Sequence, residues 1–376
     1  MKKNNWKSMV GCTVATMTIC MGATALAADT NVFVGNGAVN GTKNQPSVND
    51  VAGDASNVPE TVAQITKELK LAEGITIPRA TFHFTADKIT EDAPEAEIES
   101  VSYSAEDLKG DLSEGVYKIN KAGKITFGEF PHAGEYQYHV QETADTYDTA
   151  SGEVMTYSTE TYTMHVYVIN TENGGTEVEK ITASNTAGDK VSEMNFENIY
   201  IKNDASLTIS KTTAGKNADR TKDFAFTLTF TKSGTATDDT YEGMIGNEKV
   251  EFKAGEAKTF ELHDGEKIVF TNIPAGTRYA VTETGTAYYT PSVEVVENGV
   301  KTVDVKAAKG QSLSSAEAGA TNLVGEGNNS ADFTNTFDDV PITGVILENL
   351  PFTILIGAAA VLLAMGTFVK RFKKEK

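Results

Sequence analysis

Cysteine is almost absent from this chain. The 376 residues contain two cysteines, Cys12 and Cys20, both within the first twenty positions. The remainder of the chain can therefore form no disulfide bond, zinc–cysteine cluster or thiol nucleophile. Basic residues are also scarce, because 33 Lys and Arg stand against 52 Asp and Glu, a formal net charge of −19. This excess argues against nucleic acid as a partner, since phosphate binding requires clustered lysine and arginine.

Sequence motifs of enzymes and metal sites are absent as well. The five histidines are scattered, with no H-E-x-x-H motif and no nucleophile elbow around a serine. Acidic loops such as Asp238-Asp239 lack the spacing of an EF-hand. We therefore expect neither an enzyme nor a bound metal ion or cofactor.

The first 27 residues have the features of a secretory signal peptide. Lys2 and Lys3 precede an apolar stretch from Met9 to Ala23, and Ala27 ends an A-x-A cleavage site. The apolar stretch is shorter than the roughly twenty residues of a membrane anchor. Residues 28–60 are rich in Asn, Gly, Thr and Asp, so we expect a flexible leader there.

Residues 340–376 combine a short motif, an apolar span and a basic tail. The motif is Val340-Pro341-Ile342-Thr343-Gly344, and Leu350 to Val369 forms a span of 20 residues without a charge. Such a span can cross a bilayer, and the basic tail would stay in the cytoplasm. An ordinary single-span membrane protein is one interpretation. The order of the three parts instead resembles the cell-wall sorting signal of Gram-positive surface proteins, which a sortase cleaves between Thr and Gly. The chain would then occupy the membrane only before sorting.

Residues 61–338 alternate apolar and polar side chains in short runs that Gly, Asn and Asp interrupt. This alternation predicts an all-β fold of the sandwich or barrel type. The pattern also occurs twice, because Lys124 to Phe127 matches Lys267 to Phe270. We therefore expect two copies of one domain, residues 61–200 and 201–338.

Each half places one lysine, one glutamate and one asparagine on an apolar strand face. Side chains at i and i+2 share a face of a β-strand. Lys67 therefore lies on the face of Ile65 and Leu69, and Asn198 on the face of Phe196. The full sets are Lys67, Glu142 and Asn198 in the first half and Lys211, Glu283 and Asn335 in the second.

Burial would change the chemistry of these side chains. Desolvation disfavours charge, so a buried lysine tends to lose its proton and a buried glutamate to keep one. A neutral amine is a nucleophile, and a protonated carboxyl can polarise the amide carbonyl of asparagine. The product would be a lysine–asparagine amide, with ammonia released. A buried ion pair beside a hydrogen-bonded asparagine is the alternative for a single set. Two sets at matched spacing favour the amide.

The two sets, the tandem β-domains and the sorting motif together resemble the shaft pilins of Gram-positive bacteria, of the streptococcal T-antigen type. This resemblance implies domains with an immunoglobulin-like β-sandwich fold. It also implies autocatalytic isopeptide bonds between Lys67 and Asn198 and between Lys211 and Asn335, assisted by Glu142 and Glu283.

The same resemblance implies a lysine near the end of the first domain that receives the C-terminal threonine of the next subunit. Lys190 occupies this position and would be joined to Thr343. We therefore expect a structural subunit of a covalent, cell-wall-anchored surface pilus. Its expected partners are identical subunits, a pilus-type sortase, minor pilins and peptidoglycan. The alternative is a monomeric wall-anchored adhesin or stalk protein built from the same domains.

Overall fold

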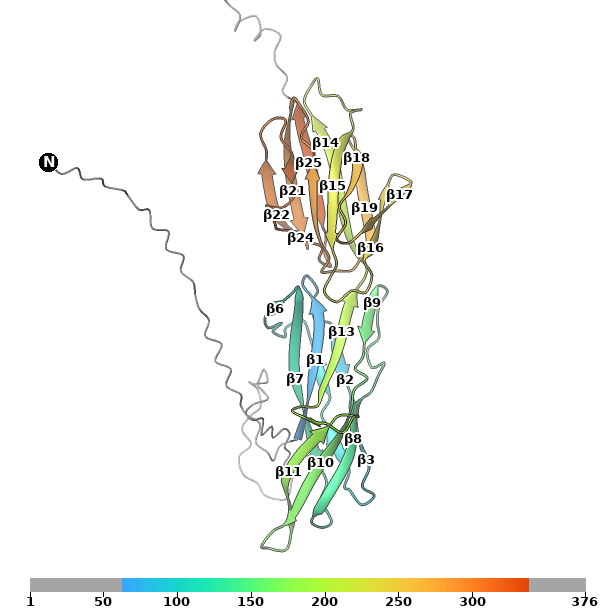
Figure 1. Cartoon of the computed structure of the whole chain (residues 1–376), viewed down its shortest axis with the longest axis vertical. Helices are drawn as coiled ribbons and strands as arrows, with labels where there is room; N and C mark the ends of the chain where they lie inside the picture. Colours follow the sequence, from blue (N-terminus) through green and yellow to red (C-terminus); the bar gives the residue numbers. More distant parts are fainter. Residues whose placement is uncertain (1–62, 338–376) are drawn as a thin grey trace, which may run out of the picture.

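The structure of the protein is a computed structural model that describes residues 63–337. All regular secondary structure in this range is β-strand, which confirms the predicted all-β class. The strands form two sandwich domains stacked end to end (Figure 1). Within residues 63–337, no helix has the length and apolar character needed to span a membrane. The predicted signal peptide, leader and sorting signal lie outside the described residues.

The first domain contains two sheets and a two-stranded ribbon. One sheet has the order β4 (Ala96–Ile98), β7 (Val116–Phe127), β1 (Ala63–Ala72), β13 (Asn195–Lys202), β9 (Glu153–Thr156), and β6 (Leu112–Ser113) pairs with β7. The other sheet has the order β12 (Lys190–Val191), β11 (Thr176–Ser184), β10 (Thr161–Asn170), β8 (Gly134–Glu142), β3 (Phe84–Lys88). The ribbon pairs β2 (Ala80–Phe82) with β5 (Val101–Tyr103).

The second domain repeats the two-sheet arrangement. Its larger sheet has the order β17 (Glu248–Lys253), β16 (Thr240–Ile245), β19 (Lys267–Ile273), β14 (Ala205–Ala214), β25 (Ser330–Phe337), β21 (Tyr289–Glu297), β22 (Val300–Lys306). Its smaller sheet has the order β18 (Lys258–Leu262), β15 (Phe224–Thr231), β20 (Arg278–Glu283), β23 (Leu313–Ser314), and β24 (Asn322–Leu323) also pairs with β20.

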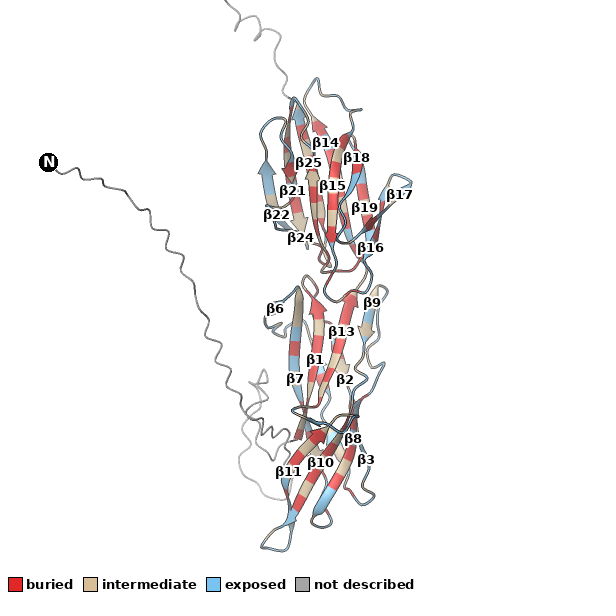
Figure 2. Cartoon of the chain, in the orientation of Figure 1, coloured by how far each residue is buried: buried red, intermediate tan, exposed pale blue. Residues whose placement is uncertain are grey.

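Strict alternation along the strands explains the sandwich. β10, for example, buries every second residue from Tyr162 to Val168, and Figure 2 shows the same alternation on most central strands. The inward-facing rings of the two sheets then meet in the core. The ring centroids of Phe127 on β7 and Tyr138 on β8 are 5.6 Å apart. In the second domain, those of Phe226 on β15 and Phe333 on β25 are 5.2 Å apart. Packing of aromatic rings between sheets therefore holds both sandwiches together.

In each domain the first and last strands are parallel neighbours. β1 pairs with β13 so that Lys67 lies opposite Phe196, and β14 pairs with β25 so that Lys211 lies opposite Phe333. In both domains the asparagine of the set follows two residues after that phenylalanine. The register of lysine and asparagine is therefore the same in both domains, and a link between them would close almost the whole domain into a loop.

The joint between the domains is short and held by direct contacts. Only two residues separate the end of β13 from the start of β14. The Ala275 N–H donates a hydrogen bond to the Lys202 carbonyl at 2.8 Å, and Arg278 forms an ion pair with Glu73 of the first domain. Backbone and side-chain contacts therefore both fix the second domain on the first.

Candidate functional site

The lysine, glutamate and asparagine of the first domain meet in its core. Lys67 on β1 and Asn198 on β13 come from adjacent strands of one sheet, and Glu142 comes from the end of β8 in the facing sheet. Lys67 Nζ lies 2.9 Å from Glu142 Oε2 and 3.1 Å from the Phe196 carbonyl oxygen. Asn198 Nδ2 donates to Glu142 Oε1 at 2.7 Å. Lys67 and Asn198 are 0% exposed, so the carboxylate joins two side chains that have no access to water.

The second domain builds the same cluster from equivalent strands. Lys211 comes from β14, Asn335 from β25 and Glu283 from the end of β20 in the facing sheet. Lys211 Nζ lies 2.9 Å from Glu283 Oε1, and Asn335 Nδ2 donates to the same oxygen at 2.6 Å. All three residues are buried. The structure thus brings together both predicted sets of three.

A shared backbone contact positions the two glutamates. Each glutamate is followed by a threonine, Thr143 in the first domain and Thr284 in the second. The Thr143 N–H donates to the His83 carbonyl, and the Thr284 N–H donates to the Ala225 carbonyl, both at 2.8 Å. These bonds tie the end of the glutamate strand to the neighbouring strand and hold the carboxyl group over the lysine.

Burial drives both partners of each cluster toward their neutral forms. Desolvation lowers the pKa of Lys67 to about 8, although the nearby Glu142 charge opposes the shift. Desolvation likewise lowers the pKa of Lys211 and raises the pKa of Glu142 and of Glu283. Each amine also lies over an aromatic ring, Lys67 at 4.6 Å from the Phe82 centroid and Lys211 at 4.1 Å from the Phe224 centroid. An apolar ring on one side and a carboxyl on the other leave the amine no water to hydrate a charge.

The two clusters differ at the asparagine carbonyl. In the first domain the Ser158 backbone N–H donates to Asn198 Oδ1 at 2.8 Å. In the second domain neither Asn335 Oδ1 nor Glu283 Oε2 has a hydrogen-bond partner among the described residues. An N–H at an amide oxygen can stabilise the negative charge that develops when a nucleophile attacks the carbonyl carbon. Ser158 is therefore a candidate site residue that sequence reasoning missed, because a backbone donor leaves no signal in residue type.

This arrangement can form an amide without a cofactor. A neutral lysine amine offers a lone pair, the asparagine offers an activated carbonyl, and the carboxyl can carry the proton between them. Within residues 63–337, no three His, Cys, Asp or Glu side chains converge as metal ligands would.

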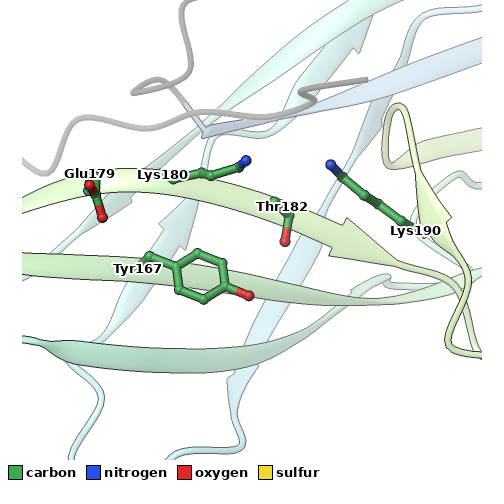
Figure 3. A pocket seen from close by; sticks show the side chains of 5 residues that line it. All are labelled: Tyr167, Glu179, Lys180, Thr182 and Lys190. Atoms are coloured by element: carbon green, nitrogen blue, oxygen red, sulfur yellow. The ribbon is translucent and has the colours of Figure 1, made fainter. Parts of the chain in front are cut away.

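Lys190 lies apart from both clusters, at the edge of its sheet. It is the exposed first residue of β12, opposite Ser184 of β11. Asn185 Oδ1 accepts two backbone N–H groups of the preceding turn, at 2.9 and 3.0 Å, and so fixes the approach to Lys190. A groove of about 390 Å³ runs beside it (Figure 3), and its lining residues are Tyr167, Glu179, Lys180, Thr182 and Lys190.

The other lysines near Lys190 in the sequence have different surroundings. Lys202 lies at the joint, where its Nζ is 3.9 Å from the carboxylates of Glu153 and Glu326. Lys180 lines the same groove as Lys190. Lys190 forms no ion pair or side-chain hydrogen bond within residues 63–337, so its amine is accessible to a second molecule.

Comparison with known families assigns the two domains separately. Residues 63–201 match the family described as "Spy0128-like isopeptide containing domain". Residues 205–337 match a family described only as a domain of unknown function.

Similar proteins come from streptococcal pili. A pilin of Streptococcus pyogenes serotype M1 is 29% identical over 254 residues, which cover 64% of this chain and 69% of that pilin. The pilus tip adhesin Cpa of Streptococcus pyogenes is 41% identical over 104 residues, covering 27% of this chain and 14% of the adhesin. A crystal structure of the major pilin from Streptococcus pyogenes is 25% identical, covers 74% of this chain and 99% of that one, and gives a TM-score of 0.32.

The predicted resemblance to streptococcal shaft pilins is thereby confirmed. These similarities support a pilus shaft subunit, and residues 63–201 belong to the Spy0128-like isopeptide-containing family. Subunits of this class assemble with other pilins at the cell surface.

Intact mass tests whether the clusters react. If both do, the chain from residue 28 to 343 has a mass two ammonia equivalents below the mass of its sequence. Glu142→Ala and Glu283→Ala should each restore one equivalent, because each removes the proton carrier of one cluster. Glu135→Ala, a surface substitution, is the control and should leave the deficit unchanged. A parent protein without any deficit would show that the clusters are only buried ion pairs.

The pH dependence of ammonia loss during refolding tests the protonation states. The reactive form has a neutral amine and a protonated carboxyl. Between the raised pKa of Glu142 and the lowered pKa of Lys67, an increase in pH raises the fraction of neutral Lys67 as much as it lowers the fraction of protonated Glu142. The rate should therefore not change with pH in this range. Above about pH 8 the rate should fall as the carboxyl deprotonates, and in acid it should fall as the amine protonates. A rate that keeps rising toward about pH 10 would contradict the acid function of Glu142.

Proposed function

We propose that this chain is polymerised by an amide between Thr343 of one subunit and Lys190 of the next, and that one lysine–asparagine amide closes each domain. The observation that carries the proposal is the pair of buried clusters, which link the first and last strands of both domains in the same register. The exposure of Lys190, at the start of β12 directly after a fixed turn, supports the assignment of the intersubunit link.

The internal reaction is balanced within the chain. The lone pair of Lys67 Nζ attacks Cγ of Asn198, and the Ser158 N–H stabilises the oxygen that becomes negative. Protonated Glu142 gives its proton to the leaving nitrogen of Asn198 and takes one from the attacking nitrogen of Lys67, so it ends protonated as it began. One C–N bond forms, one breaks, and ammonia leaves. Lys211, Glu283 and Asn335 would exchange the same protons in the second domain, where Asn335 Oδ1 has no donor equivalent to the Ser158 N–H among the described residues.

The intersubunit reaction needs an enzyme that the chain itself does not supply. A pilus-type sortase would break the Thr343–Gly344 peptide bond and hold the Thr343 acyl group as a thioester. The amine of Lys190 in the next subunit would then displace the sortase and form the amide. The last subunit would pass to peptidoglycan, which anchors the polymer in the cell wall.

The internal bonds suit a thin polymer outside the cell. Each would close a loop of about 130 residues, which in the entropy model for cross-links stabilises the folded state by about 4–5 kcal/mol. An amide also resists reductants, which a disulfide does not. A chain without cysteine beyond residue 20 thus gains covalent closure that does not depend on redox conditions.

A monomeric wall-anchored stalk or adhesin is the second candidate. The similarity of 104 residues to a pilus tip adhesin favours it, because that adhesin uses a related segment within a longer protein. The two candidates differ in whether Lys190 is consumed.

Substitution of Lys190 decides between them. Lys190→Ala should abolish the high-mass ladder in boiled SDS gels of cell-wall extracts, because the acyl group loses its acceptor. Monomer should remain on the wall, since cleavage at Thr343 needs no internal lysine. Lys202→Ala, at the joint, is the matched control and should leave the ladder intact. A ladder that survives Lys190→Ala would refute the proposed link, and a parent chain without a ladder would favour the stalk.

Single-molecule pulling tests how the bonds carry force. Between handles at positions 190 and 343, tension follows β13 into β14 and reaches Lys211, where an amide to Asn335 would carry it directly to β25. Glu283→Ala should therefore release about 120 further residues, an added extension of about 400 Å at 3.3–3.6 Å per residue. Glu142→Ala should release little, because residues 63–189 lie outside this path. A long extension in Glu142→Ala instead would show that the load enters elsewhere than Lys190.

A further inference from the structure

The backbone leaves the sheet beside the asparagine of the first domain but not beside that of the second. β9 ends at Thr156, opposite Ile199, so the chain departs from β13 one residue before it would lie beside Asn198. β21 instead pairs with all eight residues of β25, and Pro291, which has no N–H, lies opposite Asn335. Among the described residues, a backbone donor reaches the asparagine carbonyl in the first domain only.

The connection that follows each of these strands explains the difference. β9 leads into β10, which belongs to the facing sheet, so residues 157–160 must cross from one sheet to the other. β21 leads into β22 of the same sheet, the two strands lie side by side (Figure 1), and the backbone stays in the ladder. The crossing takes only four residues and brings the Ser158 N–H to 2.8 Å from Asn198 Oδ1. The donor is therefore a consequence of the strand order in the first domain.

The segment that leads into this crossing is fixed by its own contacts. Glu153 Oε2 accepts a hydrogen bond from the Tyr147 hydroxyl at 3.0 Å. The Tyr147 N–H donates to the Tyr157 hydroxyl oxygen at 2.8 Å, and the Tyr147 ring packs edge-on against Tyr200 of β13, with the centroids 6.0 Å apart. Residues 147–158 therefore form an arm that is tied to itself and to the strand of the reacting asparagine.

The arm also contacts the ring that lies against the lysine. The ring centroids of Tyr157 and Phe82 are 6.1 Å apart, and Lys67 Nζ lies over the Phe82 ring. Tyr103 packs on Phe82 as well, with the centroids 5.8 Å apart, so two tyrosines hold this ring in place. The arm therefore acts at both reacting groups, because Tyr157 supports the ring against the amine and the Ser158 N–H meets the carbonyl oxygen.

The second domain shares the ring contact but lacks the donor. The ring of Tyr289 packs edge-on against Phe224, with the centroids 5.3 Å apart, and Lys211 Nζ lies over the Phe224 ring. In both clusters a carboxyl oxygen lies 2.9 Å from the amine. The amine and the acid are therefore held alike in the two domains. The N–H at the carbonyl oxygen is the difference that bears on the chemical step.

We infer that the arm makes the first-domain amide form faster than the second-domain amide, with the Ser158 N–H as the donor to the reacting carbonyl and Tyr157 as a positioning residue. The inference rests on the proposed lysine–asparagine amides. In both domains the C–N bond to lysine forms, the C–N bond to the amide nitrogen breaks, and ammonia leaves with the proton that the glutamate supplies. Negative charge develops meanwhile on the asparagine oxygen, and a donor that is already in place stabilises it without reorganisation.

The faster bond would close the part of the chain that carries the proposed acceptor lysine. Lys190 stands between Lys67 and Asn198 in the sequence, and its strand β12 pairs with β11 of the first domain. The first domain would therefore become covalently closed around Lys190 before the second domain closes.

Refolding of the full chain tests the inference. The chain is isolated unreacted in urea and refolded with detergent in mildly acidic buffer, where little of the Lys67 amine is neutral, so chemistry and not folding limits the first amide. Samples are quenched at intervals, and mass spectrometry counts the Lys67–Asn198 and Lys211–Asn335 branched peptides separately. The first amide should form at least about tenfold faster than the second, since one donor to a developing oxyanion is worth about 10²–10³ in rate in enzymes.

Substitutions in the arm separate the N–H from the side chain. Ser158→Pro removes the N–H and should slow the first amide at least about tenfold, with the second amide unchanged as internal standard. Ser158→Ala keeps the N–H, is the matched control and should react at the parent rate. Tyr157→Ala keeps the N–H but loosens it, so it should slow the first amide by a smaller factor. Protease resistance of the same samples reports folding, which a merely structural role would delay together with the amide and a positioning role would not.

The possible failures are distinct. Equal rates in the parent chain, or a faster second amide, would overturn the inference while the proposed amides stand. A folded Ser158→Pro chain that reacts at the parent rate would overturn it as well, and if this variant does not fold, the ratio of the two rates in the parent chain decides. Tyr157→Ala at the parent rate would show that Tyr157 positions nothing. A parent chain that yields neither branched peptide would instead refute the proposed amides themselves.

Discussion

The contact of a buried lysine with a glutamate and an asparagine joins the first strand of each domain to the last. Keeping two ionisable groups charged in an apolar core costs free energy. Removal of one partner would leave the other charge buried without a counter-charge. An amide would remove this cost, because the lysine and asparagine side chains become one neutral group. It would also join the first and last strands covalently. β1 and β13, and likewise β14 and β25, are central neighbours in their sheets, so the integrity of each sheet depends on these two strands staying together.

The strand period predicted much of this site from the sequence. Lys67 and Asn198 lie among buried apolar residues two positions away on either side, so their inward orientation follows from alternation alone. The repeat added Lys211, Glu283 and Asn335 by the same rule. The all-β class also followed from alternation, because a period of two that recurs over many short segments is typical of β-strands and not of helices.

Other parts of the site depend on pairing between distant strands, which alternation does not fix. The parallel register of β1 with β13 sets which side chain lies beside Lys67, and only the fold determines it. The Ser158 N–H reaches Asn198 from a loop, and any residue except proline could supply that donor. A β-bulge beside Tyr167 places the consecutive residues Glu179 and Lys180 both on the outer face of the sheet. Strict alternation would put them on opposite faces, and so would have predicted a different lining of the groove.

Peptide mapping of the mature chain tests the central claim most directly, because it locates the bonds that an intact mass only counts. After digestion, tandem mass spectrometry should find two branched peptides, one that joins Lys67 to Asn198 and one that joins Lys211 to Asn335, each lacking one ammonia. Linear peptides with free Lys67 and free Lys211, and no branched species, would contradict the account and leave two buried ion pairs in its place.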